Sequence, residues 1–171
     1  MFEFTESIMI AAPATAAWEL LADVERWWMP SNPEHIRMEV RSQGRPMGVG
    51  TKIAFEERVA GITGSAEGII TQLSPGEQAT WEGTAVYRYF GLRLQVHEGV
   101  SWRVERHDQG SKLSAHVWAE FPATTIGRIL EWYAKSVLNV VERDREHARR
   151  ELEYVKGVIE GAGTRVDEGS A

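Results

Sequence analysis

The sequence of 171 residues contains no cysteine. This absence excludes disulfide bonds, thiol nucleophiles and thiolate metal ligands. Long apolar runs are missing as well, and the first ten residues lack the basic segment and apolar stretch of a signal peptide. We therefore expect a cytoplasmic protein that makes no stable insertion into a membrane.

Positive charge is scarcer than negative charge, with 19 lysines and arginines against 25 acidic residues and a formal net charge of -6. Because a nucleic-acid surface needs a basic face, no nucleic-acid partner is expected. Phosphate loops, dinucleotide fingerprints and nucleophile elbows are absent too. No metal-site spacing links the five histidines, so the prediction includes neither a metal nor a cofactor. These histidines are His35, His97, His107, His116 and His147.

Tryptophan, in contrast, is abundant, with seven residues in the chain. Each buries a large apolar area but carries an N–H group that needs a partner, so such residues suit pocket walls as well as cores. The hydrophobic content of 43% is ordinary for one globular domain. We expect residues 1–160 to form that single domain and residues 161–171 to be a mobile tail.

The order of periodic patterns predicts an α+β fold. Alternation over residues 2–10 indicates a half-buried strand, and Pro13 then begins two short helical segments that reach Met29. Short turns separate the later strand-like segments, so an antiparallel sheet of seven strands is expected. These six segments lie near residues 35–43, 51–60, 62–73, 77–90, 92–107 and 112–121.

A helical pattern runs without interruption through residues 124–160. Its apolar residues recur at three- and four-residue steps from Ile126 to Val141, and Asp144 then takes the next inward position. A helix of this length would span about 55 Å, which is more than a sheet of short strands covers. We expect the first half to roof the sheet. The part beyond Asp144 would contact the first strand or a partner.

Hairpin turns fix strand register and so predict which residues face each other. A four-residue turn at 108–111 would pair Val104 with Ala115 and Trp102 with Val117. Turns at 60–61 and 75–76 would gather small residues at the centre of one face. Such residues mark bulges or close backbone approach, or they form the floor of a ligand cavity. They are Gly64, Ala66, Gly68, Gly83 and Ala85.

A cavity over this floor would take its walls from the neighbouring aromatic residues and its lid from the last helix. Tyr87 and Tyr89 would offer hydroxyl groups to a ligand carbonyl, although buried structural tyrosines are more common. The predicted ligand-binding residues are Phe55, Glu57, Ala66, Gly68, Trp81, Gly83, Ala85, Tyr87, Tyr89, Trp102, Tyr133, Val137 and Val140.

Glu57 is the best candidate for a catalytic group. Its register places it opposite Gly64 on the inward face, where desolvation would raise the pKa of its carboxyl group towards that of a useful acid or base. The alternative is a hydrated carboxylate, or one paired with an arginine. Glu98 is a second inward carboxylate by register. Asp144 and His147, three residues apart on the helix, mark either the mouth of the pocket or the end of the buried half.

The order of elements resembles the helix-grip fold of the START and Bet v1-like (SRPBCC) superfamily. Residues 10–30 are similar to the N-terminal segment of its polyketide cyclase/dehydrase and lipid-transport family, through Pro13, Trp18, Asp23, Trp28 and Pro30. The resemblance implies a seven-stranded antiparallel curved sheet wrapped around a long C-terminal helix, with two short helices after the first strand. It also implies a pocket for lipids, polyketides or isoprenoid-like molecules, but no particular reaction.

Three functions follow from these patterns. The first is binding of a hydrophobic small molecule. The second is an aromatase/cyclase-type enzyme that uses Glu57 as its acid-base group and a tyrosine to polarise a carbonyl. The third is a protein-interaction domain. The sequence leaves the ligand and the oligomeric state open, with a homodimer among the alternatives.

Overall fold

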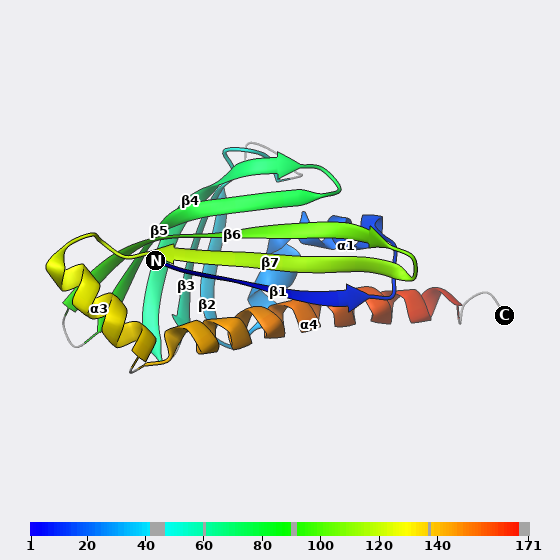
Figure 1. The fold of residues 1–171 in the computed structure, drawn as a ribbon. Coiled ribbons are helices and arrows are strands. Elements are labelled where there is room, and N and C mark those ends of the chain that lie inside the picture. Colours follow the sequence, from blue (N-terminus) through cyan, green and yellow to red (C-terminus); the bar gives the residue numbers. More distant parts are fainter. Residues whose placement is uncertain (42–46, 60, 90–91, 137, 168–171) are drawn as a thin grey trace.

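The computed structural model describes residues 1–41, 47–59, 61–89, 92–136 and 138–167 (Figure 1). Strand β1 is followed by two short helices, six further strands and two C-terminal helices. Their bounds are β1 (Phe2–Ile10), α1 (Ala14–Leu21), α2 (Val24–Ser31), β2 (His35–Arg41), β3 (Lys52–Val59), β4 (Ile62–Ser74), β5 (Gln78–Tyr89), β6 (Leu92–His107), β7 (Gly110–Glu120), α3 (Thr125–Ser136) and α4 (Val140–Asp167).

The strands form one antiparallel sheet of seven in the order β1-β7-β6-β5-β4-β3-β2. Consecutive strands are neighbours from β2 to β7, and β1 closes the far edge beside β7. The curved sheet and the C-terminal helix that packs on it (Figure 1) confirm the predicted α+β helix-grip architecture. Within the described part of the chain, no helix is both long and apolar enough to cross a membrane.

The registers predicted for two of the hairpins are confirmed. Glu57 pairs with Gly64 between β3 and β4, and Gly68 pairs with Gly83 between β4 and β5. The register predicted for β6 and β7 is wrong by two residues, since Trp102 pairs with Ala115 rather than Val117. The cause is a shorter turn, in which His107 pairs directly with Gly110. A shift of two residues preserves the face of every side chain, so the inward set is unchanged.

The prediction of one uninterrupted C-terminal helix is also wrong. Helix α3 ends at Ser136 and α4 begins at Val140. Asn139, just before α4, has a φ of 51°, a left-handed backbone conformation that ends a right-handed helix and that asparagine tolerates better than most residues. Helix α4 also continues past Glu160 to Asp167, so residues 161–167 are helical, while residues 168–171 lie outside the described residues.

The two C-terminal helices differ in burial, in the opposite sense to the prediction. The stripe beyond Asp144 is the packed one, because α4 lies along β1 and contacts α1 and α2. Its buried residues are Ala148, Leu152, Val155 and Ile159. Helix α3, in contrast, exposes 60% of Ile129 and 62% of Trp132. The helix beyond Asp144 therefore packs on the first strand, which is one of the two alternatives that the sequence left open.

Candidate functional site

A cavity of about 180 Å³ lies between the sheet and the helices α2, α3 and α4. Strands β3 to β7 supply most of its wall, and Leu130 and Tyr133 of α3 and Val140 of α4 cover it. Most of the side chains around it are apolar or aromatic. Trp28, Phe55 and Trp81 form one continuous aromatic surface, with ring centroids 5.1 Å apart at each step.

Seven of the thirteen predicted ligand-binding residues lie on this wall. They are Phe55, Glu57, Trp81, Tyr87, Trp102, Tyr133 and Val140. Val137 lies outside the described residues. Tyr89 is placed only by its backbone pairing with Leu92, since its side chain is not described.

The small residues predicted as the floor do not belong to the cavity wall formed by the described residues. They are Gly64, Ala66, Gly68, Gly83 and Ala85. A Cβ atom at Gly83 would lie 2.6 Å from the ring of Trp81, and one at Gly64 would lie 2.5 Å from the ring of Tyr87. At Gly68 the backbone of β5 takes the same space. Gly64 and Gly83 therefore let two aromatic side chains pack against the sheet, and these side chains form part of the wall.

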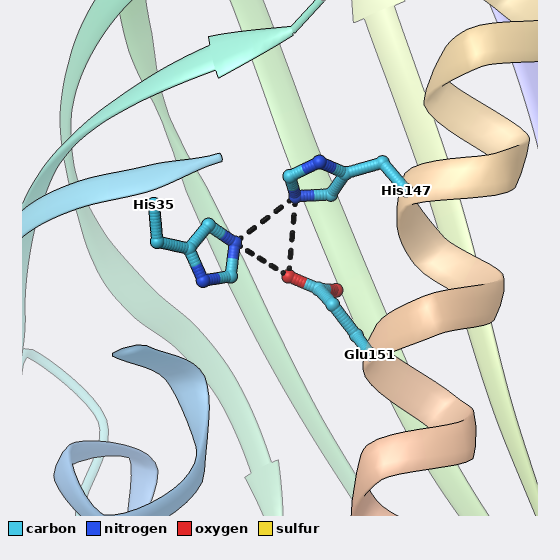
Figure 2. Close-up of side chains that lie close together, drawn as sticks. All are labelled: His35, His147 and Glu151. Atoms are coloured by element: carbon cyan, nitrogen blue, oxygen red, sulfur yellow. Dashed lines mark hydrogen bonds and ion pairs between the residues drawn. The ribbon is translucent and has the colours of Figure 1, made fainter. Parts of the chain in front are cut away.

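A cluster of three polar side chains lies at one side of the cavity (Figure 2). His147 and Glu151 belong to the wall, and His35 contacts both of them. His35 comes from the start of β2, while His147 and Glu151 lie one helical turn apart on α4. The Nε2 atoms of the two imidazoles are 3.0 Å apart. Glu151 Oε1 lies 3.0 Å from Nε2 of His35 and 3.4 Å from Nε2 of His147. Both histidines are buried.

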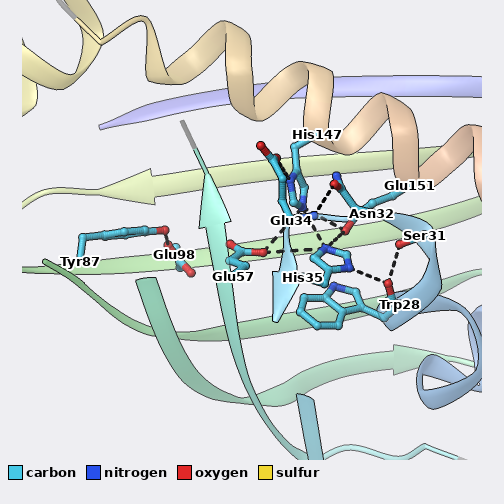
Figure 3. Close-up of polar contacts among 10 residues, drawn as sticks. All are labelled: Trp28, Ser31, Asn32, Glu34, His35, Glu57, Tyr87, Glu98, His147 and Glu151. Atoms are coloured by element: carbon cyan, nitrogen blue, oxygen red, sulfur yellow. Dashed lines mark hydrogen bonds and ion pairs between the residues drawn. The ribbon is translucent and has the colours of Figure 1, made fainter. Parts of the chain in front are cut away.

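Each imidazole is held from behind through its Nδ1 atom (Figure 3). His35 Nδ1 lies 2.6 Å from the carbonyl oxygen of Trp28. The imidazole of His35 also stacks on the indole of Trp28, with ring centroids 3.6 Å apart. His147 Nδ1 lies 3.0 Å from Oε2 of Glu34. The Glu34 backbone N–H in turn donates to Asn32 Oδ1 at 3.1 Å. These contacts fix the orientation of both rings.

Glu57 lies between this cluster and a second polar pair, as Figure 3 shows. Its Oε2 is 3.6 Å from Nε2 of His147 and 3.9 Å from Nε2 of His35. Burial raises the pKa of Glu57 to about 8, against the opposing charge of His147 and with the help of nearby carboxylates. At neutral pH the carboxyl group is therefore largely protonated and able to donate a proton or a hydrogen bond.

The second polar pair joins Tyr87 and Glu98. The Tyr87 hydroxyl donates to Glu98 Oε2 at 2.8 Å. Burial raises the pKa of Glu98 to about 7 even though the tyrosine hydrogen bond lowers it. Burial also raises the pKa of Asp144, which lines the cavity, to about 6. The predicted inward positions of Glu98 and Asp144 are thus confirmed. The Tyr87 hydroxyl already has a hydrogen-bond partner in Glu98.

Burial alone would lower the pKa of His147, but hydrogen bonds and charge from Glu151, together with the Glu57 and Glu34 carboxylates, raise it well above its usual range. Burial would raise the pKa of Glu151, yet hydrogen bonds from both histidines hold it well below its usual value. With no ion bound, this group is therefore an imidazolium paired with a carboxylate.

Sequence reasoning missed His35 and Glu151 and assigned His147 only a boundary role. The four-residue spacing of His147 and Glu151 on a predicted helix was an available signal. No sequence signal pointed to His35, because it is 112 residues away from His147 and only the fold brings it to α4. The sequence predicted no metal site, and that prediction did not consider these three residues together, whose candidate ligand atoms lie within 4.8 Å of one another.

Comparison with protein families finds one model that matches residues 1–160, described as polyketide cyclase/dehydrase and lipid transport. No curated protein matches the sequence significantly.

Solved structures share the fold at low sequence identity. The Zhui aromatase/cyclase from Streptomyces sp. R1128 is 20% identical, with a TM-score of 0.66 over 93% of each chain. The di-domain aromatase/cyclase BexL from the BE-7585A biosynthetic pathway is 16% identical, with a TM-score of 0.66 over 91% of this chain and 48% of its own. Protein TTHA0849 from Thermus thermophilus is 14% identical, with a TM-score of 0.62 over 94% of this chain and 99% of its own.

Proposed function

The chain belongs to the polyketide cyclase/dehydrase and lipid transport family, and on this premise we propose that it binds a hydrophobic, ring-containing small molecule with at least one oxygen acceptor. The binding site is the cavity between the sheet and the C-terminal helices. The observation that carries the proposal is an aromatic wall with the carboxyl group of Glu57 set into it.

The aromatic wall favours a flat ligand. Trp28, Phe55 and Trp81 line the cavity side by side, and Trp102 and Tyr133 add further aromatic surface. Aromatic side chains stack favourably on other rings and bury a large apolar area. A polyketide- or isoprenoid-like ring system would use this surface better than a single acyl chain.

One donor on the wall favours a ligand with oxygen atoms. Glu57 lines the cavity, and its carboxyl group is largely protonated at neutral pH. A ligand carbonyl or hydroxyl that accepts a hydrogen bond from this group would gain affinity.

Two matched substitutions on α3 test the site. Ala134 lines the cavity, whereas Ser136, two residues on, is exposed. We expect Ala134→Trp to weaken binding of 2-naphthol, measured by tryptophan fluorescence quenching, by at least tenfold, because the new ring fills the cavity. Ser136→Trp should bind like the unmodified protein. Equal affinity in both variants would place the ligand elsewhere, and native mass spectrometry of protein from its own host would identify a retained ligand.

A second candidate function is ring closure or dehydration of a polyketide-like substrate. A protonated carboxyl group in an apolar cavity favours it. In ring closure such a group can protonate the carbonyl oxygen that becomes a hydroxyl. In dehydration it can protonate a hydroxyl that leaves as water, and the resulting carboxylate can take the proton from the adjacent carbon. Two of the structural neighbours are aromatase/cyclases, which agrees with this chemistry. Here Glu57 is the acid, and its neighbours Phe55 and Trp81 hold the substrate.

Glu57→Gln separates the two candidates. The amide keeps the shape of the side chain and can still donate a hydrogen bond, but it cannot transfer a proton. For an enzyme we expect turnover to fall by about 10²–10⁴-fold while ligand affinity changes less than threefold. A carrier should keep its affinity and show no turnover in either form. Unchanged turnover in the variant would remove Glu57 from the catalytic role.

The cavity itself supports ligand binding over the protein-interaction alternative, which called for a collapsed interior. The cytoplasmic location and the homodimer remain predictions from the sequence.

A further inference from the structure

We propose that His35, His147 and Glu151 form a binding site for a divalent transition-metal ion, with zinc as the best match. The three candidate ligand atoms are Nε2 of each histidine and Oε1 of the glutamate, and they face a common point (Figure 2). The proposal does not depend on the hydrophobic ligand, because the site is complete in the protein alone.

The orientation of the imidazoles is the first argument. A carbonyl oxygen can only accept a hydrogen bond, so the contact with Trp28 requires a proton on Nδ1 of His35. The Glu34 carboxylate holds Nδ1 of His147 in the same way. Both Nε2 atoms are then turned towards each other at 3.0 Å. In the ion-free protein a proton lies between them. A metal ion that replaces this proton would accept both lone pairs at once.

The dimensions of the triangle are the second argument. A tetrahedral zinc ion with nitrogen and oxygen ligands at about 2.0–2.2 Å holds neighbouring ligand atoms roughly 3.3 Å apart. The three sides of the triangle measure 3.0 Å, 3.0 Å and 3.4 Å. Only shifts of a few tenths of an ångström would admit the ion, and the four-residue spacing of His147 and Glu151 keeps these two ligands on one helix face.

The supporting contacts are the third argument. Metal-binding histidines almost always donate their second N–H group to a carboxylate, a backbone carbonyl or water. His147 has the carboxylate of Glu34, and His35 has the carbonyl of Trp28. The stacked Trp28 ring further restricts rotation of His35. A buried histidine that served packing alone would not need both a partner for Nδ1 and an Nε2 atom directed at the point that the three ligand atoms face.

The donor set and the surroundings indicate the kind of ion. Two imidazoles and one carboxylate suit zinc and neighbouring transition metals, whereas magnesium and calcium prefer oxygen ligands. Three protein ligands leave a fourth position open, as in catalytic rather than structural zinc sites. His147 and Glu151 line the cavity, and Glu57 lies 3.6 Å from His147, so a water molecule or a ligand oxygen would have access.

Metal titration of the tag-free protein after treatment with a chelator tests the proposal. Cobalt(II) replaces zinc in such sites and gives a visible absorption band whose intensity reports low coordination number. We expect one cobalt ion per chain, displaced by one equivalent of zinc, with a zinc Kd in the micromolar range or tighter. The isosteric variant Glu151→Gln and the variant His147→Gln should weaken zinc binding at least 100-fold.

His97→Gln is the matched control, because His97 is exposed on β6 and its side chain points to the opposite face of the sheet from that of Glu98, which lines the cavity. It should bind zinc like the unmodified protein. Circular dichroism of each variant separates loss of the site from loss of the fold. Absence of a 1:1 cobalt complex in the folded protein would overturn the proposal, as would equal zinc affinity in the unmodified protein, Glu151→Gln and His147→Gln. Binding of 2-naphthol, measured without metal, reports on the proposed function independently.

Discussion

At the residue scale, the cavity keeps ionisable side chains in an apolar setting. Glu57, Glu98 and Asp144 each have a pKa raised by burial. Such groups cost stability when they ionise, and sites with several of them are enriched in functional roles. Their retention in a cavity otherwise lined by apolar residues supports a chemical or orienting role over simple packing.

The pKa of Glu98 gives a pH-dependent prediction. The pKa of Glu98 is about 7 in the folded protein, above the ordinary value of 4.5. Between pH 4.5 and pH 7, Glu98 is therefore protonated in the folded state and ionised in the unfolded state. Stability should therefore fall as the pH rises from 4.5 to 7. Because glutamine does not ionise, Glu98→Gln should reduce this pH-dependent loss of unfolding free energy by about 2 kcal/mol. This figure is smaller than the full pKa shift implies, because the carboxyl group borders the cavity.

Urea unfolding of the unmodified protein and Glu98→Gln at several pH values measures this difference. The other carboxylates titrate in both proteins, so the difference between the two curves reports Glu98 together with its effect on the pKa of Glu57. Tyr87→Phe is a useful companion, because the tyrosine hydrogen bond lowers the pKa of Glu98 and its removal should move the transition to higher pH. A difference independent of pH would contradict the shift.

At the element scale, the C-terminal helices divide their tasks at Asn139. Helix α4 buries its apolar stripe against β1, α1 and α2, while α3 covers part of the cavity and exposes Ile129 and Trp132. The long helix thus anchors the fold, and the short one covers part of the cavity. Ligand access through movement of α3 would disturb little of the core.

This division predicts that replacing an aliphatic residue by alanine lowers the free energy of unfolding more on α4 than on α3. Leu152 on α4 is only 4% exposed, whereas Ile129 on α3 is 60% exposed. We expect Leu152→Ala to lower the free energy of unfolding by about 2–5 kcal/mol, and Ile129→Ala to change it by less than about 0.5 kcal/mol. Denaturant unfolding measures both. Similar costs in the two variants would mean that α3 is anchored as firmly as α4.

At the scale of the whole molecule, the cavity is bordered by strands from both edges of the sheet and by three of the helices. Phe2 of β1, Met38 of β2 and Trp28 of α2 all line it. A ligand therefore touches most of the elements, and its binding is coupled to folding as a whole rather than to one segment.

Ligand saturation should accordingly raise the melting temperature of the entire domain. Binding to the folded state alone adds about 2.7 kcal/mol to its stability at a free ligand concentration of 100 times Kd. We expect a single cooperative transition, followed by circular dichroism, that moves several degrees higher with 2-naphthol. Ala134→Trp should lose the shift. A shift that persists in this variant would indicate binding outside the cavity.

The sequence by itself determined the order of elements, the seven antiparallel strands and two of the hairpin registers. Local periodicity and turn residues carry that information, because they depend on neighbours a few positions apart. It also placed Phe55, Glu57, Trp81 and Tyr87 on one inward face, since side chains alternate along strands.

Only the tertiary structure decided which groups meet across the molecule. Two of the small residues that looked like a floor, Gly64 and Gly83, face the rings of Tyr87 and Trp81, and no strand pattern specifies the directions of these side chains. The helix break at Asn139 follows from a single left-handed residue inside a pattern that is otherwise continuous. The His35, His147 and Glu151 cluster exists because α4 packs along the sheet, and packing brings together residues that are remote in sequence and carry no signal individually.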